Sequence, residues 1–162
     1  MIVSTKSPAF LPSEIPPDAH VAIVAARFNA QIVDVLLDGC VRRLGELGLG
    51  PARVQVHRVP GAFELPVAAK VLAQTSRFGA IICLGCVVRG DTPHFDYVAG
   101  EAARGIQQVA LSENIPVIFG VLTTNTEQQA LDRAGGTHGH AGANAAEAAA
   151  EMIVMVDRAR KR

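Results

Sequence analysis

Hydrophobic residues occur in blocks along the chain, and the length and spacing of each block predict one strand or one helix. Residues 80–88 form the most apolar block, and they lack the alternation of a half-buried strand. They predict a strand that is buried on both faces at the centre of a parallel sheet. Apolar runs predict three more strands, at residues 21–26, 53–59 and 116–122. Of these, residues 53–59 alternate enough to lie nearer an edge.

Apolar positions at helical spacing follow each predicted strand. Asn29 suits the N-cap of the first helix, and Gly48 suits its C-terminal stop. Before the fourth helix, Thr124 and Glu127 have the form of a capping box, with Thr124 as the cap. The predicted helices cover residues 30 to about 47, 66 to before 78, 94 onward, 125 to 133, and about 141 to 160. The glycine-rich segment 135–142 is expected to be flexible. This order predicts an α/β fold, a three-layer αβα sandwich whose four-stranded parallel sheet has flavodoxin-like connectivity.

Length and composition predict how the chain is organised. Its 162 residues are enough for one domain with a core, which we expect over residues 20–162. Residues 1–19 contain four prolines and little periodicity, so they predict an extended N-terminal arm that lies on a neighbour or is partly disordered. Hydrophobic residues make up 49% of the chain, and 15 glycines take the apolar share above the usual range of about 45–50%. We therefore expect a homo-oligomer, although exposed helix alanines would also explain the surplus.

Charge and targeting signals argue against several classes of function. The formal net charge is zero, aromatic residues make up 4% of the chain and no long basic run occurs, which argues against binding to nucleic acid or to an anionic membrane. No segment resembles a signal peptide or a membrane span, so we expect a cytoplasmic protein. No G-x-G-x-x-G or G-x-x-x-x-G-K-[ST] motif occurs, which removes the main support for dinucleotide or nucleoside-triphosphate binding.

The cysteines and histidines do not predict a disulfide or a metal site. Three cysteines argue against a disulfide framework. Cys83 and Cys86 form a C-x-x-C pattern, but within a strand they would point to opposite faces, about 10 Å apart. That separation fits neither a disulfide nor a shared metal. His138 and His140 lack nearby cysteine or carboxylate partners, which makes them weak candidates for metal ligands.

Polar and aromatic side chains occur in the turns after the predicted strands, where open parallel sheets place functional groups. Asp91, Thr92 and His94 follow the central strand, at the start of a helix whose free N–H groups suit an anion. The alternative is a capped loop with a solvated charge pair. Phe28 is either a core aromatic or a platform for a planar ligand. Glu64 either complements a helix dipole or accepts hydrogen bonds from a polyol or an amine.

Five segments carry a family resemblance: residues 27–29 (RFN), 59–66 (VPGAFELP), 90–98 (GDTPHFDYV), 119–125 (FGVLTTN) and 131–135 (LDRAG). In this order and spacing they resemble the 6,7-dimethyl-8-ribityllumazine synthase family, and the resemblance covers about residues 21–152. It implies that the chain condenses 5-amino-6-(D-ribitylamino)uracil with 3,4-dihydroxy-2-butanone 4-phosphate, releasing phosphate and water. In the family this reaction is the penultimate step of riboflavin biosynthesis and needs no metal or organic cofactor.

The resemblance also implies a role for each candidate site residue. The ribitylaminouracil would be bound by Phe28, Ala62, Phe63, Glu64, the main chain of Cys86, Val87 and Val88, and Phe119. The phosphate-bearing substrate would be bound by Asp91, Thr92 and Arg133. His94 matches the residue that transfers protons. Phe119 and Arg133 match positions that the adjacent subunit supplies; without the resemblance, Arg133 is either solvated or aimed at an oxyanion.

The sequence departs from the family pattern near the phosphate. Many relatives carry a lysine near Ala141, so either His138 or His140 replaces it or Arg133 acts with less help. Asp91 stands where relatives often have a small neutral residue, and its backbone would then be the part that binds.

The resemblance implies a homo-oligomer, because family members form pentamers or capsids of sixty subunits. The absence of an insertion between residues 133 and 152 favours the capsid. Riboflavin synthase is a candidate partner. Two other hypotheses are a non-catalytic module that binds a flavin or ribityl ligand, and a capsid shell. His94 and Arg133 favour the enzyme, since storage requires neither a proton shuttle nor a phosphate clamp.

Overall fold

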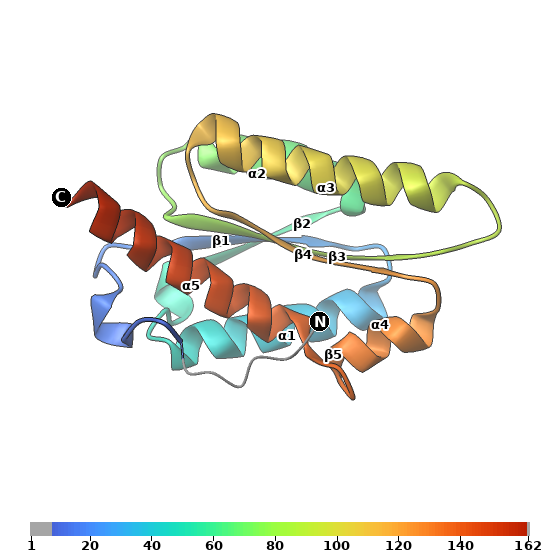
Figure 1. Cartoon of the computed structure of the whole chain (residues 1–162), viewed down its shortest axis with the longest axis horizontal. Helices are drawn as coiled ribbons and strands as arrows, with labels where there is room; N and C mark the ends of the chain where they lie inside the picture. Colours follow the sequence, from blue (N-terminus) through green and yellow to red (C-terminus); the bar gives the residue numbers. More distant parts are fainter. Residues whose placement is uncertain (1–7, 162) are drawn as a thin grey trace.

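A four-stranded parallel sheet forms the middle layer of the computed structural model, which describes residues 8–161 (Figure 1). Its strands are β1 (Val21–Ala26), β2 (Val54–Val59), β3 (Ala80–Val88) and β4 (Val117–Thr124). Their order across the sheet is β2-β1-β3-β4, so β2 and β4 are the edge strands and β3 lies inside. This order confirms the predicted α/β fold with flavodoxin-like connectivity and the edge position of the second strand.

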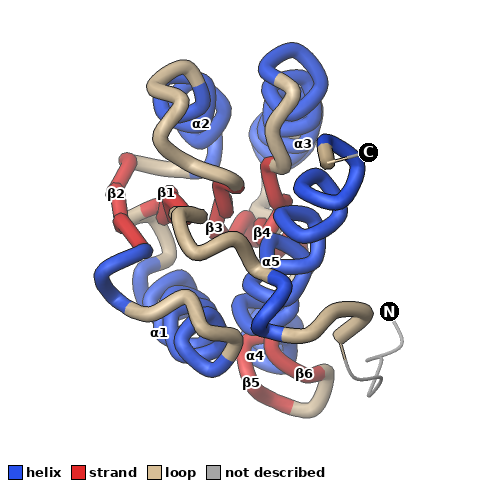
Figure 2. The backbone as a smooth tube through the Cα atoms, turned by 90° about the vertical axis from the view of Figure 1, so that its left-hand side faces the viewer, coloured by secondary structure: helices blue, strands red, loops and turns tan. Residues whose placement is uncertain are grey.

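Helices cover both faces of the sheet and complete the three predicted layers (Figure 2). One face carries α2 (Leu65–Ala73) and α3 (His94–Glu113), and the other carries α1 (Ala30–Glu46), α4 (Glu127–Arg133) and α5 (Ala141–Arg160). Short 3-10 helices occur at Pro12–Glu14, Pro51–Arg53 and Ala62–Glu64. The predicted stop of α1 is confirmed, because Gly48 has the positive φ of 93° that a helix end of this kind needs.

Strand β3 separates two hydrophobic cores. Leu84 and Cys86 pack on the side of α1 and α5, while Ile81 and Cys83 pack on the side of α2 and α3. The two cysteines therefore point to opposite faces, as their spacing in the strand predicts. Burial raises the pKa of the Cys83 thiol to about 12 and that of Cys86 to about 11, where the Glu127 carboxylate adds a smaller upward effect. Both thiols are neutral at physiological pH and serve as small apolar groups in the cores.

The end of β4 and the start of α4 differ from the prediction. Thr124 stays in the sheet, paired with Val88, and its carbonyl accepts the Arg89 N–H at 2.8 Å. The N-cap of α4 is Thr126, whose side-chain oxygen accepts the Gln129 N–H at 3.2 Å. The predicted capping box headed by Thr124 is therefore wrong. The reason is that β3 is long enough to keep two more residues of β4 paired than the apolar pattern indicates.

The glycine-rich segment after α4 is ordered rather than flexible. It forms an antiparallel hairpin of β5 (Ala134–Gly136) and β6 (Gly139–His140) that leads directly into α5. Gly135 and Gly139 have φ values of 96° and 81°, which residues with a Cβ rarely adopt. The glycines thus make a tight turn here, and the expectation of flexibility is wrong.

The N-terminal segment contacts the core of its own subunit over the residues that the structure describes. Phe10 and Ile15 are buried in the core that includes α1 and α5. The guanidinium group of Arg53 donates to the Ala19 carbonyl at 2.8 Å and ties the segment to the start of β2. The remainder of the predicted arm, residues 1–7, lies outside the described residues.

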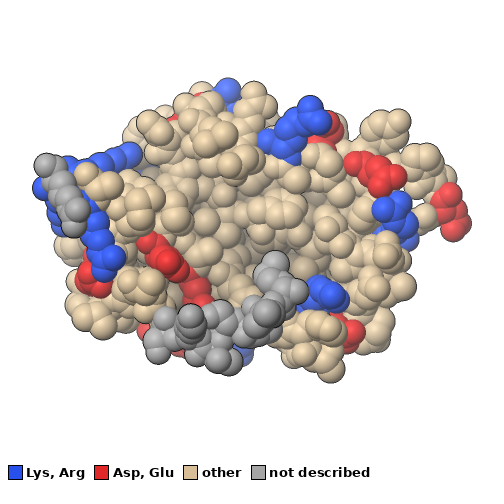
Figure 3. Space-filling model, in the orientation of Figure 1, with Lys and Arg blue, Asp and Glu red and all other residues tan. Residues whose placement is uncertain are grey.

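Charged groups are dispersed over the surface. On the face seen in Figure 3, acidic and basic side chains lie next to one another towards both ends of the molecule, and uncharged residues cover most of the surface between them. This distribution agrees with the zero formal net charge. Within residues 8–161, every helix is too short or too polar to cross a lipid bilayer.

Candidate active site at the carboxyl end of the sheet

The turns that follow the four parallel strands all leave the sheet at one end, which is the right-hand end in Figure 1. Two backbone hydrogen bonds join the turns after β1 and β2: the Arg27 N–H donates to the Val59 carbonyl at 2.8 Å, and the Phe28 N–H to the Pro60 carbonyl at 3.0 Å. The Phe28 side chain is 71% exposed. The core-aromatic alternative is therefore wrong, and the ring is free to contact a ligand.

Asn29 holds the Phe28 turn against the central strand. Its backbone is left-handed, with φ 58° and ψ 45°, and its side-chain Nδ2 donates to the Cys86 carbonyl at 2.8 Å. Asn29 occupies the predicted N-cap position of α1, but its side chain does not cap the helix. The hydrogen bond spans 57 residues of sequence, and sequence reasoning missed it because the same residue type also suits an ordinary cap.

The turn after β2 places an aromatic ring and a carboxylate beside Phe28. Gly61 lies between the two side chains: a Cβ added there would be 3.3 Å from Glu64 Oε2 and 4.0 Å from the Phe28 Cβ. Glu64 and Phe28 are therefore on either side of this glycine. Phe63 is 57% exposed, Ala62 is buried, and Glu64 is half-buried. Glu64 is the N-cap residue of α2, yet its carboxylate makes no capping hydrogen bond. That carboxylate is therefore available as an acceptor for a ligand.

Arg89 organises the start of the loop between β3 and α3. Its Nε donates to Asn125 Oδ1 at 3.2 Å, its Nη2 lies 3.2 Å from the Asp96 carboxylate, and its guanidinium carbon lies 4.3 Å from the centre of the Phe95 ring. A half-exposed ion pair alone contributes little to stability, but the Arg89 guanidinium combines an ion pair, a hydrogen bond and a contact with an aromatic ring. They join the loops after β3 and β4 and define where the following residues lie.

Asp91, Thr92 and His94 are exposed in this loop. The Thr92 side-chain oxygen accepts the His94 N–H at 3.4 Å, and His94 is the first residue of α3, a helix of 20 residues. The N-terminal end of α3 thus faces solvent next to a histidine, a hydroxyl group and a carboxylate. Upstream, Val87 and Val88 are half-buried at the end of β3. The main chain here lies near the Phe28 turn, because Asn29 contacts the adjoining Cys86.

Phe119 and Arg133 lie in a different place. They line a groove of about 390 Å³ between the edge strand β4 and α5, and none of the other candidate site residues contributes to its lining. Phe119 is 44% exposed, and Arg133 Nη1 donates to the Gln129 carbonyl at 2.9 Å. Arg133 ends α4, on the face of the sheet opposite α3 and His94 (Figure 2). The fold therefore brings the candidate residues together in two groups.

The two histidines after α4 have different environments. His138 is exposed, with Nδ1 3.1 Å from the Thr137 hydroxyl. His140 is half-buried and is the N-cap of α5, where its Nδ1 accepts the Ala143 N–H at 3.3 Å. Burial and the positive charge of Arg42 lower the pKa of His140. Because capping already uses the His140 ring, it is a poor substitute for a phosphate-binding lysine.

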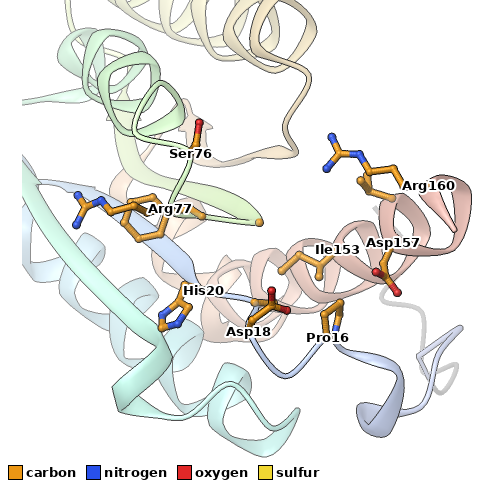
Figure 4. Close-up of a pocket in the computed structure, with 12 residues that line it drawn as sticks. Pro16, Asp18, His20, Ser76, Arg77, Ile153, Asp157 and Arg160 are labelled. Carbon is orange, nitrogen blue, oxygen red and sulfur yellow. The ribbon is translucent and has the colours of Figure 1, made fainter.

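A separate cavity of about 270 Å³ lies at the opposite end of the sheet (Figure 4). Its wall combines the residues before β1, the connection between α2 and β3, and the last turns of α5, including His20, Arg77 and Arg160. None of the candidate site residues lines it. Among residues 8–161, the histidine, cysteine and carboxylate side chains form no group of three that could hold a metal ion.

Comparison with known proteins places this geometry in a family. The family model for 6,7-dimethyl-8-ribityllumazine synthase matches residues 18–157, a range that includes every candidate site residue. Proteins named 6,7-dimethyl-8-ribityllumazine synthase from Yersinia pestis (strain Pestoides F) and Yersinia pseudotuberculosis serotype O:1b (strain IP 31758) are each 52% identical to the chain over 141 residues. Each match covers 86% of this chain and 90% of the relative. The chain therefore belongs to the 6,7-dimethyl-8-ribityllumazine synthase family.

Proposed function

We propose that this chain condenses 5-amino-6-(D-ribitylamino)uracil with 3,4-dihydroxy-2-butanone 4-phosphate to give 6,7-dimethyl-8-ribityllumazine, phosphate and water, in the penultimate step of riboflavin biosynthesis. Membership of the family supports this reaction. The observation that carries the assignment to a site is that Phe28, Glu64 and His94 follow β1, β2 and β3 at one end of the parallel sheet, all with side chains that reach solvent.

The pyrimidine substrate fits the turns after β1 and β2. Phe28 offers an exposed ring that stacks on a planar heterocycle. The end of β3, from Cys86 to Val88, offers main-chain groups for the polar edge of the uracil. Glu64 accepts hydrogen bonds from the ribityl hydroxyl groups, because its carboxylate is not used in capping. Phe63 lies in the same turn and covers the apolar part of this site.

The phosphate of the second substrate fits the start of α3. Free N–H groups and the helix dipole make such an end favourable for an anion, and Thr92 adds a hydroxyl group. The Asp91 carboxylate would repel phosphate, so we assign its backbone N–H to the anion and its side chain to solvent, where it is exposed. Arg133 supplies the cation, since a buried phosphate without a counter-charge is costly.

His94 transfers protons between the two bound substrates. The amine of the pyrimidine attacks the ketone carbon, and the resulting carbinolamine loses water to form an imine. Loss of a proton from the carbon next to the imine then expels phosphate by breaking its C–O bond, and the enol that remains becomes a ketone. The second amine attacks this ketone and loses a second molecule of water to close the ring. Each step moves a proton near neutral pH, which is the work of a histidine. Holding both substrates in the right orientation supplies much of the remaining rate enhancement.

We propose that a complete site needs two subunits of a cytoplasmic homo-oligomer. Phe119 and Arg133 line a groove apart from the other candidate residues, so a neighbouring copy that presents its groove to the His94 loop would complete the site. Exposed apolar side chains on α2 and α3, including Val67, Val71 and Leu111, support further contacts between copies. Residues 1–7 remain a predicted arm, whereas Phe10 and Ile15 pack on the core of their own subunit. Riboflavin synthase, which would consume the lumazine, remains a candidate partner.

The test is to mix the purified protein with both substrates, in buffer with and without a metal chelator. Formation of the fluorescent lumazine together with an equal amount of phosphate is expected in both cases. Folded protein that gives no product above the rate of the uncatalysed reaction would contradict the proposal. A protein that binds the pyrimidine without turnover would instead favour the binding-module hypothesis.

A further inference from the structure

The ring of His140 caps α5 and packs against α1. Its Nδ1 accepts the Ala143 N–H at 3.3 Å, which makes the imidazole the N-cap of α5. The ring also lies against α1, because a Cβ built on Gly39 of that helix would be 2.2 Å from the ring Nε2. An Nδ1 that accepts carries no hydrogen, so the neutral ring has its hydrogen on Nε2. This tautomer follows from the hydrogen-bond network.

The ring of His140 occupies a slot that only glycines leave open. A Cβ at Gly39 of α1 would lie 2.1 Å from the ring Cε1, and a Cβ at Gly135 of β5 would lie 3.1 Å from the ring Cδ2. Gly142 is the second residue of α5, and a Cβ there would lie 2.0 Å from the carbonyl oxygen of Leu36 on α1, which is a collision. The glycines therefore allow α1, β5 and α5 to come close enough to enclose the imidazole.

The same residue is linked to Arg133 through the hairpin. His140 in β6 pairs with Ala134 in β5, and Ala134 directly follows Arg133, the last residue of α4. Arg133 is itself held by a hydrogen bond to the Gln129 carbonyl one turn earlier. The cap of α5, the hairpin and the guanidinium of Arg133 therefore form one continuous unit.

We infer that His140 is a positioning residue that, in its neutral form, holds Arg133 in place for the phosphate-bearing substrate, and that its protonation releases this hold. The inference rests on the proposed function, because it assigns Arg133 to the phosphate. A protonated Nδ1 is a donor and cannot accept the Ala143 N–H. The new charge would also face the positive end of the α5 dipole, which is unfavourable.

Burial and one nearby cation outweigh the groups that would favour a protonated His140. Burial is the larger cause that lowers the pKa of the ring, the positive charge of Arg42 on α1 lowers it further, and hydrogen bonding to the backbone acts in the opposite direction. On the other packed elements, Asp132 accepts a hydrogen bond from Gln128 on α4, and Glu147 on α5 is paired with Arg43. Folding lowers the pKa of His140 below the ordinary histidine value of about 6.5. The cap is therefore fully present above about pH 6.5, and it is lost as the pH falls through the lower pKa of the folded protein.

The experiment compares the assembled wild-type protein with His140→Asn and His140→Ala. Asparagine also caps helices but does not titrate, whereas alanine removes the cap. The Michaelis constant for 3,4-dihydroxy-2-butanone 4-phosphate is measured from pH 5 to 8 for all three. We expect it to rise in the wild type relative to His140→Asn as the pH falls through the folded pKa of His140, which lies below the ordinary value of about 6.5, by roughly 5-fold, the scale of one lost cap. His140→Ala should show the higher constant at every pH.

Control readouts separate the inference from the proposed function. The Michaelis constant for the pyrimidine and the turnover number should differ little between wild type and His140→Asn, because Arg133 serves the other substrate. The substrate phosphate and His94 titrate equally in both proteins, so only their difference reports His140. If all three proteins are active and the wild-type and His140→Asn profiles coincide, the inference is wrong and the function stands. If His140→Asn behaves like His140→Ala at every pH, capping is not the role of His140.

If the wild type makes no lumazine, the proposed function itself fails. A titration of the His140 ring followed by NMR then tests the cap alone, and an Ala143 amide signal that does not respond would overturn it.

Discussion

Replacing Asn29 with alanine tests how the structure holds Phe28 at the site. The substitution removes the 2.8 Å hydrogen bond to the Cys86 carbonyl and leaves that carbonyl without its side-chain donor next to the core. Losing a partner of a buried polar group costs about 1–3 kcal/mol. Alanine must also adopt a φ of 58°, where asparagine is tolerated, and this costs about another 1–2 kcal/mol. We expect a total loss of about 2–5 kcal/mol in the free energy of unfolding.

Asn114 offers a matched control for this substitution. Its backbone has nearly the same left-handed conformation, with φ 56° and ψ 42°, at the end of α3. In contrast to Asn29, it is exposed, and no hydrogen bond from its side chain occurs among the described residues. Asn114→Ala should therefore show the backbone cost alone, and the difference between the two variants isolates the hydrogen bond. Asn29→Gly relieves the backbone cost and should fall between Asn29→Ala and the wild type.

The assay is urea unfolding followed by circular dichroism, at one subunit concentration, because association changes the apparent stability. We expect Asn29→Ala to be less stable than Asn114→Ala by about 1–3 kcal/mol. The Michaelis constant for the pyrimidine should rise in Asn29→Gly, because the Phe28 turn has lost its contact with β3. Equal losses of stability in Asn29→Ala and Asn114→Ala would refute the reasoning, since the bond to Cys86 would then contribute nothing.

Three further predictions concern the catalytic loop and the thiols. His94→Ala should lower the turnover number by roughly 10- to 10⁴-fold with little change in pyrimidine binding, as steady-state kinetics and a binding titration will show; unchanged turnover would make His94 an ordinary helix-start residue. Arg89→Ala should lower kcat/KM by releasing the loop that carries His94, and Arg89→Lys should restore only part of it, because lysine lacks the planar fork; full recovery with lysine would contradict this. The buried thiols should react with a disulfide reagent at pH 8 only after denaturation, because burial raises the pKa of Cys40 and Cys83 to about 12 and leaves a thiolate fraction on the order of 10⁻⁴; rapid reaction of the folded protein would contradict the burial.

The strands could be predicted from the sequence because each is an apolar block with a clear end. β1 and β3 have the predicted bounds, and α5 begins and ends at the predicted residues. The errors lie where two signals compete at short range. Thr124 and Thr126 both suit a helix cap, and only the length of the neighbouring strand decides between them. The hairpin after α4 is too short and too rich in glycine to show a period of two, so its order could not be predicted.

The candidate site could be predicted as residues at strand ends but not as an arrangement. The exposure of Phe28 and the contact between Asn29 and Cys86 depend on how the β1 turn meets β3, which lies far along the sequence. The role of His140 was not foreseen, because its slot is formed by Gly39 and Gly135 from two other elements. Glycines carry no side-chain signal, so the space they leave is visible only in three dimensions.

We propose that two subunits build one condensing site, with His94 from one subunit and Arg133 from the next. The most direct measurement unfolds His94→Ala and Arg133→Ala proteins together, refolds them as mixed assemblies and assays lumazine formation, with each variant refolded alone as the control. With equal amounts and random assembly, about a quarter of the interfaces in a closed ring would combine an intact His94 with an intact Arg133. We expect the mixed assemblies to recover about that fraction of wild-type activity, whereas each variant alone stays nearly inactive. Mixed particles that form but show no more activity than the separate variants would contradict the shared site.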